Sequence, residues 1–171
     1  MLLHAPSPAL TFNGVAPDLA HLTALTRRVA ADVRAGIHEV HVDPDRRWYK
    51  RLQGNDFVDV WLISWATEQA AELHDHAGSL GALTVVTGRL TEEFWSAPHT
   101  GLRTRTLHAG RSVGFGHGHV HEVSNPSTDA AVSVHAYSPP LTAMSYYDVT
   151  GGRLRRIRSE LTEPGSTQGV G

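Results

Sequence analysis

Short β-type segments separated by turn-forming residues run through the chain from residue 48 to residue 149. The expected strands are residues 48–52, 57–66, 70–76, 83–87, 90–96, 102–108, 112–116, 120–124, 130–137 and 143–149, with an outer strand at 153–158. Many short strands at this spacing favour a barrel or sandwich over alternating strand–helix units. Segment 57–66 is largely apolar on both faces, which indicates a strand covered on both sides. The sequence therefore predicts a mainly β fold.

One segment ahead of the strands has the periodicity of an amphipathic helix. Its apolar residues recur at helical spacing, at Leu19, Leu22, Leu25, Val29 and Val33. Pro17 and Asp18 suit a first helical turn, and Gly36 suits the end of the helix, which we expect to pack outside the barrel. The size of the chain favours a single domain. Its expected parts are an irregular arm, the helix, the barrel and a flexible tail, at residues 1–16, 17–36, 45–160 and 161–171.

Composition excludes several classes of function. The net charge of −2 gives no electrostatic reason to expect binding to nucleic acid or to an anionic membrane. No apolar stretch is long enough to span a membrane, and the N-terminal residues do not resemble a signal peptide. The chain has no cysteine, which removes disulfides and thiolate ligands and fits a reducing compartment. We expect a cytoplasmic protein, and a monomer.

A histidine pair, His74 and His76, is the first indication of chemistry. On a strand, residues i and i+2 point to the same face, so the two side chains would start roughly 6–7 Å apart at the backbone. Imidazoles that lean together from that separation can share one metal ion at ~2.0–2.2 Å from each ring nitrogen. A third ligand must come from elsewhere. His117, His119 and His121 also alternate, so on one strand all three would face the same way.

Two blocks of sequence contain these histidines. The first includes His74, His76, Gly81 and Gly88, and the second includes Gly110, Gly118, His121 and Asn125. Together they resemble the two metal-binding motifs of the cupin superfamily, which implies a jelly-roll-like β-barrel. The offset of His121 from Gly118 and Asn125 selects it as the third ligand. His117 and His119 then remain candidates for supporting or surface positions.

The position of Gly81 bears on what kind of metal site this is. Many cupins have a glutamate there that completes a set of four ligands. Three imidazoles without a carboxylate suit iron, zinc, copper or nickel. The missing ligand leaves coordination positions open, as metal-assisted chemistry on a bound substrate requires.

A closer resemblance, over about residues 45–150, is to the cysteine dioxygenase family. It rests on the strings Tyr49–Arg51, His74–Ser79, Thr87–Glu92, His121–Asn125 and Ala131–Pro140. The Ser-x-His-x-Tyr-Ser-Pro-Pro run that begins at Ser133 is the most specific, because cupins at large do not share it. The resemblance implies an enzyme that uses iron(II) and O2 to oxidise the thiol of L-cysteine to cysteine sulfinic acid (3-sulfinoalanine).

The resemblance also implies roles for particular residues. His74, His76 and His121 would bind iron(II). Arg51 would bind the substrate carboxylate in a pocket lined by Tyr49. The arginine fork suits that task, because it can bind a carboxylate through two parallel hydrogen bonds.

The implied catalytic residues are Tyr137, His135 and Ser133. The Tyr137 hydroxyl would lie over the metal, close to substrate and O2, with His135 and Ser133 behind it in a hydrogen-bonded relay. The spacing agrees with this role, because the three residues alternate, share one face of a strand and can bond in series.

One departure from the family and two alternative functions remain. Animal members have a cysteine at the position of Gly81, joined by a thioether to the tyrosine that matches Tyr137. This chain has no cysteine, so the cross-link is impossible, as in the bacterial branch of the family.

The nearest alternative is a dioxygenase for 3-mercaptopropionate or another small thiol, whose enzymes typically have glutamine in place of Arg51. A more distant alternative is a non-catalytic cupin that binds a metal as a sensor.

Overall fold

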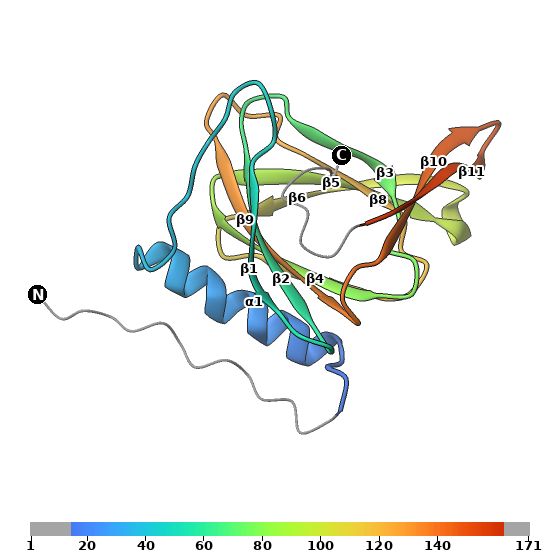
Figure 1. The fold of residues 1–171 in the computed structure, drawn as a ribbon. Helices are drawn as coiled ribbons and strands as arrows, with labels where there is room; N and C mark the ends of the chain where they lie inside the picture. Colours follow the sequence, from blue (N-terminus) through green and yellow to red (C-terminus); the bar gives the residue numbers. More distant parts are fainter. Residues whose placement is uncertain (1–14, 163–171) are drawn as a thin grey trace, which may run out of the picture.

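A computed structural model of the protein describes residues 15–162 (Figure 1). Within this range the chain forms α1 (Leu19–Arg34), the 3-10 helix η1 (Ala97–His99) and strands β1 (Tyr49–Gly54), β2 (Asp59–Trp65), β3 (Ala70–His74), β4 (Leu80–Thr87), β5 (Arg89–Ser96), β6 (Gly101–His108), β7 (Ser112–Phe115), β8 (His121–Ser124), β9 (Ala131–Ser138), β10 (Ala143–Thr150) and β11 (Arg153–Leu161). No helix in this range is long and apolar enough to cross a membrane.

Two antiparallel sheets face each other. One has the strand order β1-β2-β9-β4-β7, and the other has the order β11-β10-β3-β8-β5-β6. A core of buried side chains from both sheets lies between them. No strand pairing joins the two sheets in the described range, so they form an open jelly-roll-like barrel. The mainly β fold class expected from the sequence is confirmed.

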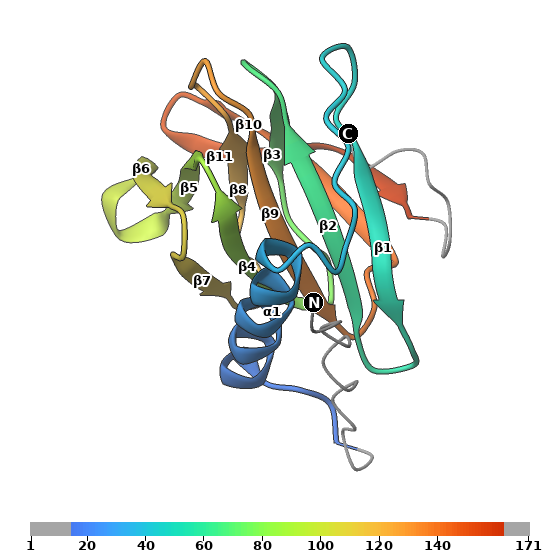
Figure 2. The ribbon, with the colours of Figure 1, turned by 90° about the vertical axis from the view of Figure 1, so that its left-hand side faces the viewer.

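Helix α1 covers the outer face of the five-stranded sheet (Figure 2). Its buried residues Leu22, Leu25 and Val29 belong to one cluster with outward-facing side chains of β4 and β9, the strands that the helix lies against. The helix is shorter than the predicted 17–36, because Asp18 caps it: its carboxylate accepts the His21 backbone N–H at 2.8 Å. The outer face of β2 belongs to the same buried cluster, against which Val40 and Trp48 also pack, and its inner face lies in the inter-sheet core, which explains why both of its faces are apolar.

Strand ends differ from the predictions where pairing or a turn decides them. Strand β4 starts at Leu80, because Leu80 and Gly81 pair with the end of β9. Strand β3 stops at His74, because the next residues form a turn in which Ala77 has a φ of 48° and donates its N–H to Asp75 Oδ1 at 3.0 Å.

The expected terminal segments fall largely outside the described range. The irregular arm at 1–16 is described only at residues 15 and 16, which have no regular structure. The tail was predicted to begin at Leu161, but Leu161 still belongs to β11, where it pairs with Ala143 of β10. Residues 163–171 lie outside the described part of the chain.

Candidate metal centre

Three buried histidines converge between the sheets. His74 ends β3 and pairs directly with His121, the first residue of β8. Their ring centroids are 4.9 Å apart, and the ring of His76 lies 4.9 Å from His74 and 5.0 Å from His121. The expectation that His74 and His76 share a strand is wrong, because His76 lies in the turn after β3. The turn nevertheless brings all three predicted ligands together.

The ring nitrogens are oriented as a metal site requires. His74 Nδ1 donates to the Glu72 carbonyl at 2.6 Å, and His121 Nδ1 donates to Glu92 Oε1 at 2.9 Å. These bonds leave each Nε2 free as a ligand atom. The Nε2 atoms of His74 and His76 are 3.2 Å apart. Two nitrogens that share a metal at ~2.1 Å lie about 3.0–3.4 Å apart between octahedral and tetrahedral geometry, so the side chains fit a first-row metal.

Burial keeps these imidazoles neutral. It lowers the pKa of His74 and His76 well below the usual value, and the neighbouring rings of the triad lower it further. Burial also lowers the pKa of His121, although the Glu92 carboxylate opposes that shift. Neutral imidazole is the form that binds a metal, so the site does not have to release protons near neutral pH before it can be loaded.

Glu92 supports the triad, and sequence reasoning gave it no role. It is fully buried on β5 and accepts hydrogen bonds from His121 Nδ1 and His119 Nε2, both at 2.9 Å, and from Arg105 Nε. Burial alone would raise the pKa of Glu92, but these three donors outweigh it and hold the pKa well below its usual range. Glu92 therefore stays ionised and fixes the His121 ring.

The same contacts settle where the other histidines lie. Among the described residues, Glu92, His119 and His121 form a second group that could hold a metal, and it shares His121 with the first. Its ligand atoms are already hydrogen-bonded to one another, so it is the support of the first site. His119 contacts Glu92, whereas His117 is exposed.

Changing Glu92 to glutamine should weaken metal binding without removing a ligand. The neutral amide loses the ionic partner that orients His121, and supporting residues of this kind are typically worth 10–100-fold in metal affinity. Competition between the protein and a chelator for zinc or cobalt measures this. Glu93→Gln on the same strand is the matched control, because Glu93 bonds Thr104 instead. Equal affinities for the two variants would contradict the support role.

The Ser133, His135 and Tyr137 side chains form the predicted series along β9. Ser133 Oγ lies 2.9 Å from His135 Nε2, and His135 Nδ1 lies 3.3 Å from the Tyr137 hydroxyl. The Trp65 indole N–H donates to Ser133 Oγ at 2.9 Å and closes the series. The Tyr137 ring is 4.9 Å from the ring of His76, so the series reaches the triad.

Burial sets the protonation of this series. It lowers the pKa of His135 to about 3, so that the imidazole is neutral. It raises the pKa of Tyr137 above the usual range, with a further contribution from the charge of Asp59, so the phenol keeps its proton. The series can therefore orient the Tyr137 hydroxyl without ionising it.

Tyr49 and Arg51 lie on the inner side of the edge strand β1. Tyr49 packs on the inter-sheet core, with its ring 6.0 Å from that of Trp61. The Arg51 guanidinium lies over the Trp61 ring, with Cζ 6.0 Å from the ring centroid. Trp61 in turn pairs with His135 across β2 and β9. The structure thus brings both predicted substrate residues to the face that carries the β9 series.

Phe115 fills the space next to Gly81. Gly81 pairs with Tyr137 on one side and with Phe115 on the other. A Cβ at Gly81 would lie 1.9 Å from Phe115 Cε2. The Phe115 ring is stacked on His76 at 4.9 Å, so it has little freedom to withdraw.

Gly81→Cys should therefore destabilise the protein and form no thioether with Tyr137. Overpacking of this kind typically costs ~1–3 kcal/mol. Denaturant unfolding measures the loss, and the intact mass after incubation with iron and thiol detects any cross-link. A second variant that combines Gly81→Cys with Phe115→Ala removes the clash and is expected to recover part of the loss. Full stability of Gly81→Cys alone would show that Phe115 moves freely.

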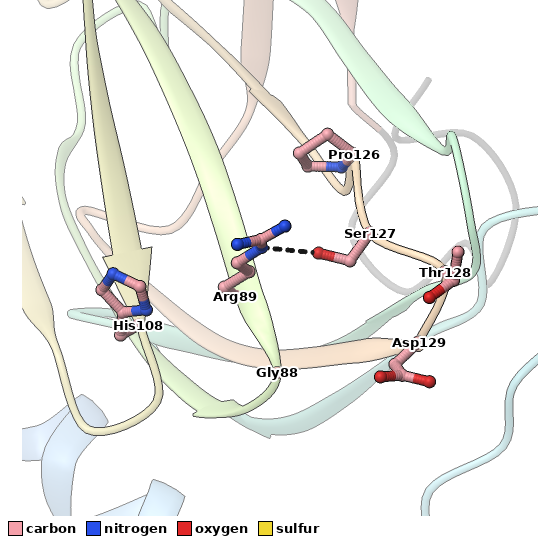
Figure 3. Close-up of a pocket in the computed structure, with 7 residues that line it drawn as sticks. All are labelled: Gly88, Arg89, His108, Pro126, Ser127, Thr128 and Asp129. Atoms are coloured by element: carbon pink, nitrogen blue, oxygen red, sulfur yellow. Dashed lines mark hydrogen bonds between the residues drawn. The ribbon is translucent and has the colours of Figure 1, made fainter.

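A surface groove of about 430 Å³ lies between the β4–β5 turn and the loop before β9 (Figure 3). It is lined by Gly88, Arg89, His108, Pro126, Ser127, Thr128 and Asp129. Arg89 Nε donates to Ser127 Oγ at 2.8 Å across it. The groove shares no residue with the triad or with the β9 series, so it is separate from the chemistry considered below.

Comparison with known proteins places this site in a family. The sequence profile of the family "Cysteine dioxygenase type I" matches residues 12–150. The chain belongs to the cysteine dioxygenase family. The cysteine dioxygenase type 1 of Danio rerio is 27% identical over 118 residues, which are 62% of this chain and 57% of the relative. The chain thus matches little more than half the length of that curated relative.

Solved structures agree on the cupin fold of this cysteine dioxygenase family member. A Klebsiella pneumoniae protein with a double-stranded β-helix domain superposes with a TM-score of 0.55 at 16% identity, over 63% of this chain and 84% of that one. A cupin superfamily protein of Desulfitobacterium hafniense gives a TM-score of 0.50 at 10% identity, over 58% and 83%. These similarities concern the fold alone.

Proposed function

We propose that the protein is an iron(II)-dependent thiol dioxygenase that converts L-cysteine to cysteine sulfinic acid. The observation that carries the proposal is the convergence of His74, His76 and His121 next to the buried ring of Tyr137. Family membership supports the reaction class. When bound, iron(II) supplies the redox chemistry that adds both atoms of O2 to the thiol sulfur.

The residues of the chain have separate tasks in this proposal. The three imidazoles hold the metal, and Glu92 keeps His121 in the correct orientation. Tyr137 directs its hydroxyl proton toward the reacting groups, because His135 and Ser133 fix the direction of that hydroxyl. Positioned donors of this kind act without reorganising during the reaction.

Arg51 and Tyr49 would hold the substrate carboxylate. Arg51 Nε and the Tyr49 hydroxyl are buried without a hydrogen-bond partner among the described residues. Buried polar groups without partners are costly, so these two favour an anionic or polar ligand in the pocket. A carboxylate meets both, since it can accept from the guanidinium and from the phenol.

An oxygen-uptake assay tests the proposal. Protein loaded with iron(II) under anaerobic conditions is mixed with oxygenated L-cysteine, 3-mercaptopropionate or cysteamine. We expect one O2 to be consumed per L-cysteine. When the assay uses isotopically labelled O2, both oxygen atoms of the sulfinic acid should carry the label. The variant His74→Ala is the control for reaction by loose iron. Faster turnover of 3-mercaptopropionate would favour the nearest alternative, and no turnover of any thiol by iron-loaded protein would favour a sensor.

A further inference from the structure

The three histidines of the triad are not held in place in the same way. His74 and His121 are placed by strand pairing, because they face each other across β3 and β8, and each also donates from Nδ1 to an oxygen. His76 follows the end of β3, and its Nδ1 has no hydrogen-bond partner within residues 15–162. Its ring packs between Phe115 and Tyr137, with centroids 4.9 Å away in each case. The backbone of the turn therefore has to fix where the His76 ring lies.

Asp75 ties that backbone to β10. Its Oδ1 accepts the backbone N–H of Ala77 at 3.0 Å and that of Ser145 at 3.2 Å. Its Oδ2 accepts the Tyr147 hydroxyl at 2.6 Å. The backbone N–H of Asp75 in turn donates to the Ser145 carbonyl at 2.9 Å. The residues before and after His76 are thus joined to each other and to the neighbouring strand.

The turn needs this support because its conformation is unfavourable. Ala77 has a φ of 48°, in the left-handed region that residues with a side chain seldom adopt. A carboxylate that accepts the N–H of such a residue forms a charge-assisted hydrogen bond, which is stronger than a bond between neutral groups. Without the Asp75 carboxylate, Ala77 is free to return to a commoner conformation. That change would move His76, the residue next to it in the chain.

Strand β10 supports both histidines of the first block. Successive residues of a strand point to opposite faces. Tyr146 faces the inter-sheet core, where it is the cross-strand partner of His74. Tyr147 is half-buried on the other face, where it reaches Asp75. Burial and the hydrogen bond to Asp75 raise the pKa of Tyr147 to about 12, so the hydroxyl keeps the proton that it donates.

We propose that Asp75, held by Tyr147, is a positioning residue that sets the place of His76 and thereby the affinity and coordination geometry of the bound divalent metal. Both oxygens of Asp75 already accept hydrogen bonds from the protein, so it acts through the backbone of the turn and not as a ligand. This inference rests on the metal-binding part of the proposed function. It does not depend on which thiol the protein oxidises.

Cobalt(II) binding tests the inference without thiol turnover, because the visible absorption of cobalt reports how its ligands are arranged. For Asp75→Ala we expect about a tenfold or greater loss of cobalt affinity in competition with a chelator, as for other residues that orient ligands. The absorption spectrum at saturating cobalt should also change. Asp75→Asn keeps an oxygen for the two backbone N–H groups and should recover most of the affinity and the wild-type spectrum. Tyr147→Phe removes one of the three donors and should fall between them.

Ser159→Ala is the matched control. It removes the hydrogen bond of 2.9 Å between Ser159 and Ser145, so it loosens the same part of β10 without touching Asp75. It should keep the cobalt affinity and spectrum of the wild type. A loss of stability that leaves cobalt binding by the folded protein unchanged would show that Asp75 is only structural, and would overturn the inference.

The other outcomes are equally decisive. A loss in Asp75→Asn as large as that in Asp75→Ala would overturn the inference, because a residue that acts by accepting N–H groups should tolerate the amide. If Asp75→Ala does not fold, Tyr147→Phe decides, and unchanged cobalt affinity in that variant would reject the role of the pair. Wild-type protein that binds cobalt, depends on Asp75 and oxidises no thiol would uphold Asp75 and reject the dioxygenase. Wild-type protein that binds no divalent metal would reject both.

Discussion

His121→Ala should strip the bound iron and abolish thiol oxidation. His121 supplies one of three ligands and also connects the triad to Glu92, because one ring nitrogen faces each. Removing it leaves two ligands and a buried carboxylate that has lost one of its three donors. The loss of metal affinity should exceed the roughly 10–100-fold expected when only a supporting residue is changed.

Metal content after dialysis and oxygen uptake measure the two effects. His117→Ala is the matched control, because His117 is exposed and lies only a few residues away on the same segment. It should retain both iron and activity. His119→Ala should fall between them, since His119 reaches the site only through Glu92. If His117→Ala loses iron while His121→Ala keeps it, the choice of the third ligand is wrong.

Arg51→Gln should sharply lower kcat/KM for L-cysteine while the iron content stays unchanged. Glutamine keeps a donor but loses the charge and the two-pronged geometry of the guanidinium. A charge-assisted hydrogen bond is typically worth ~1.5–3 kcal/mol, which is roughly a tenfold to a hundredfold change in binding. For 3-mercaptopropionate we expect a smaller fall, because its dioxygenases typically have glutamine at this position.

Steady-state kinetics with both thiols test this expectation. Lys50→Gln is the control, since it removes one charge from the neighbouring, exposed position of β1. Equal losses for the two thiols would mean that Arg51 holds the carboxylate but does not set specificity. No loss for either would make Arg51 an ordinary edge-strand arginine.

The sequence predicted those site residues that lie close together along the chain. His74, His76 and the alternating run Ser133, His135 and Tyr137 are close in sequence, so their relative placement follows from local geometry. The strands of the barrel were also visible, because apolar alternation and turn residues are local signals. Their ends were less accurate, since pairing partners decide them, as Leu80 shows at the start of β4.

The residues that sequence reasoning missed depend on register between distant strands. Glu92 forms a hydrogen bond with His121, which is 29 residues away in the sequence. Asp59 is the cross-strand neighbour of Tyr137 only because β2 and β9 pair in that register. Phe115 reaches Gly81 in the same way through β7. An acidic or aromatic residue on a strand gives no local sign of such a neighbour. Only the paired sheet reveals that Glu92 and Asp59 face the interior.

The contact between Phe115 and Gly81 limits the order in which substitutions can accumulate. A lineage with glycine and phenylalanine at these positions loses stability if it acquires the cross-linking cysteine first, because the new Cβ and the ring would occupy the same space. If the aromatic ring shrinks or turns away first, one side of His76 loses its packing before any cross-link can compensate. The unlinked form is therefore separated from the linked form by an intermediate with a less well packed metal site.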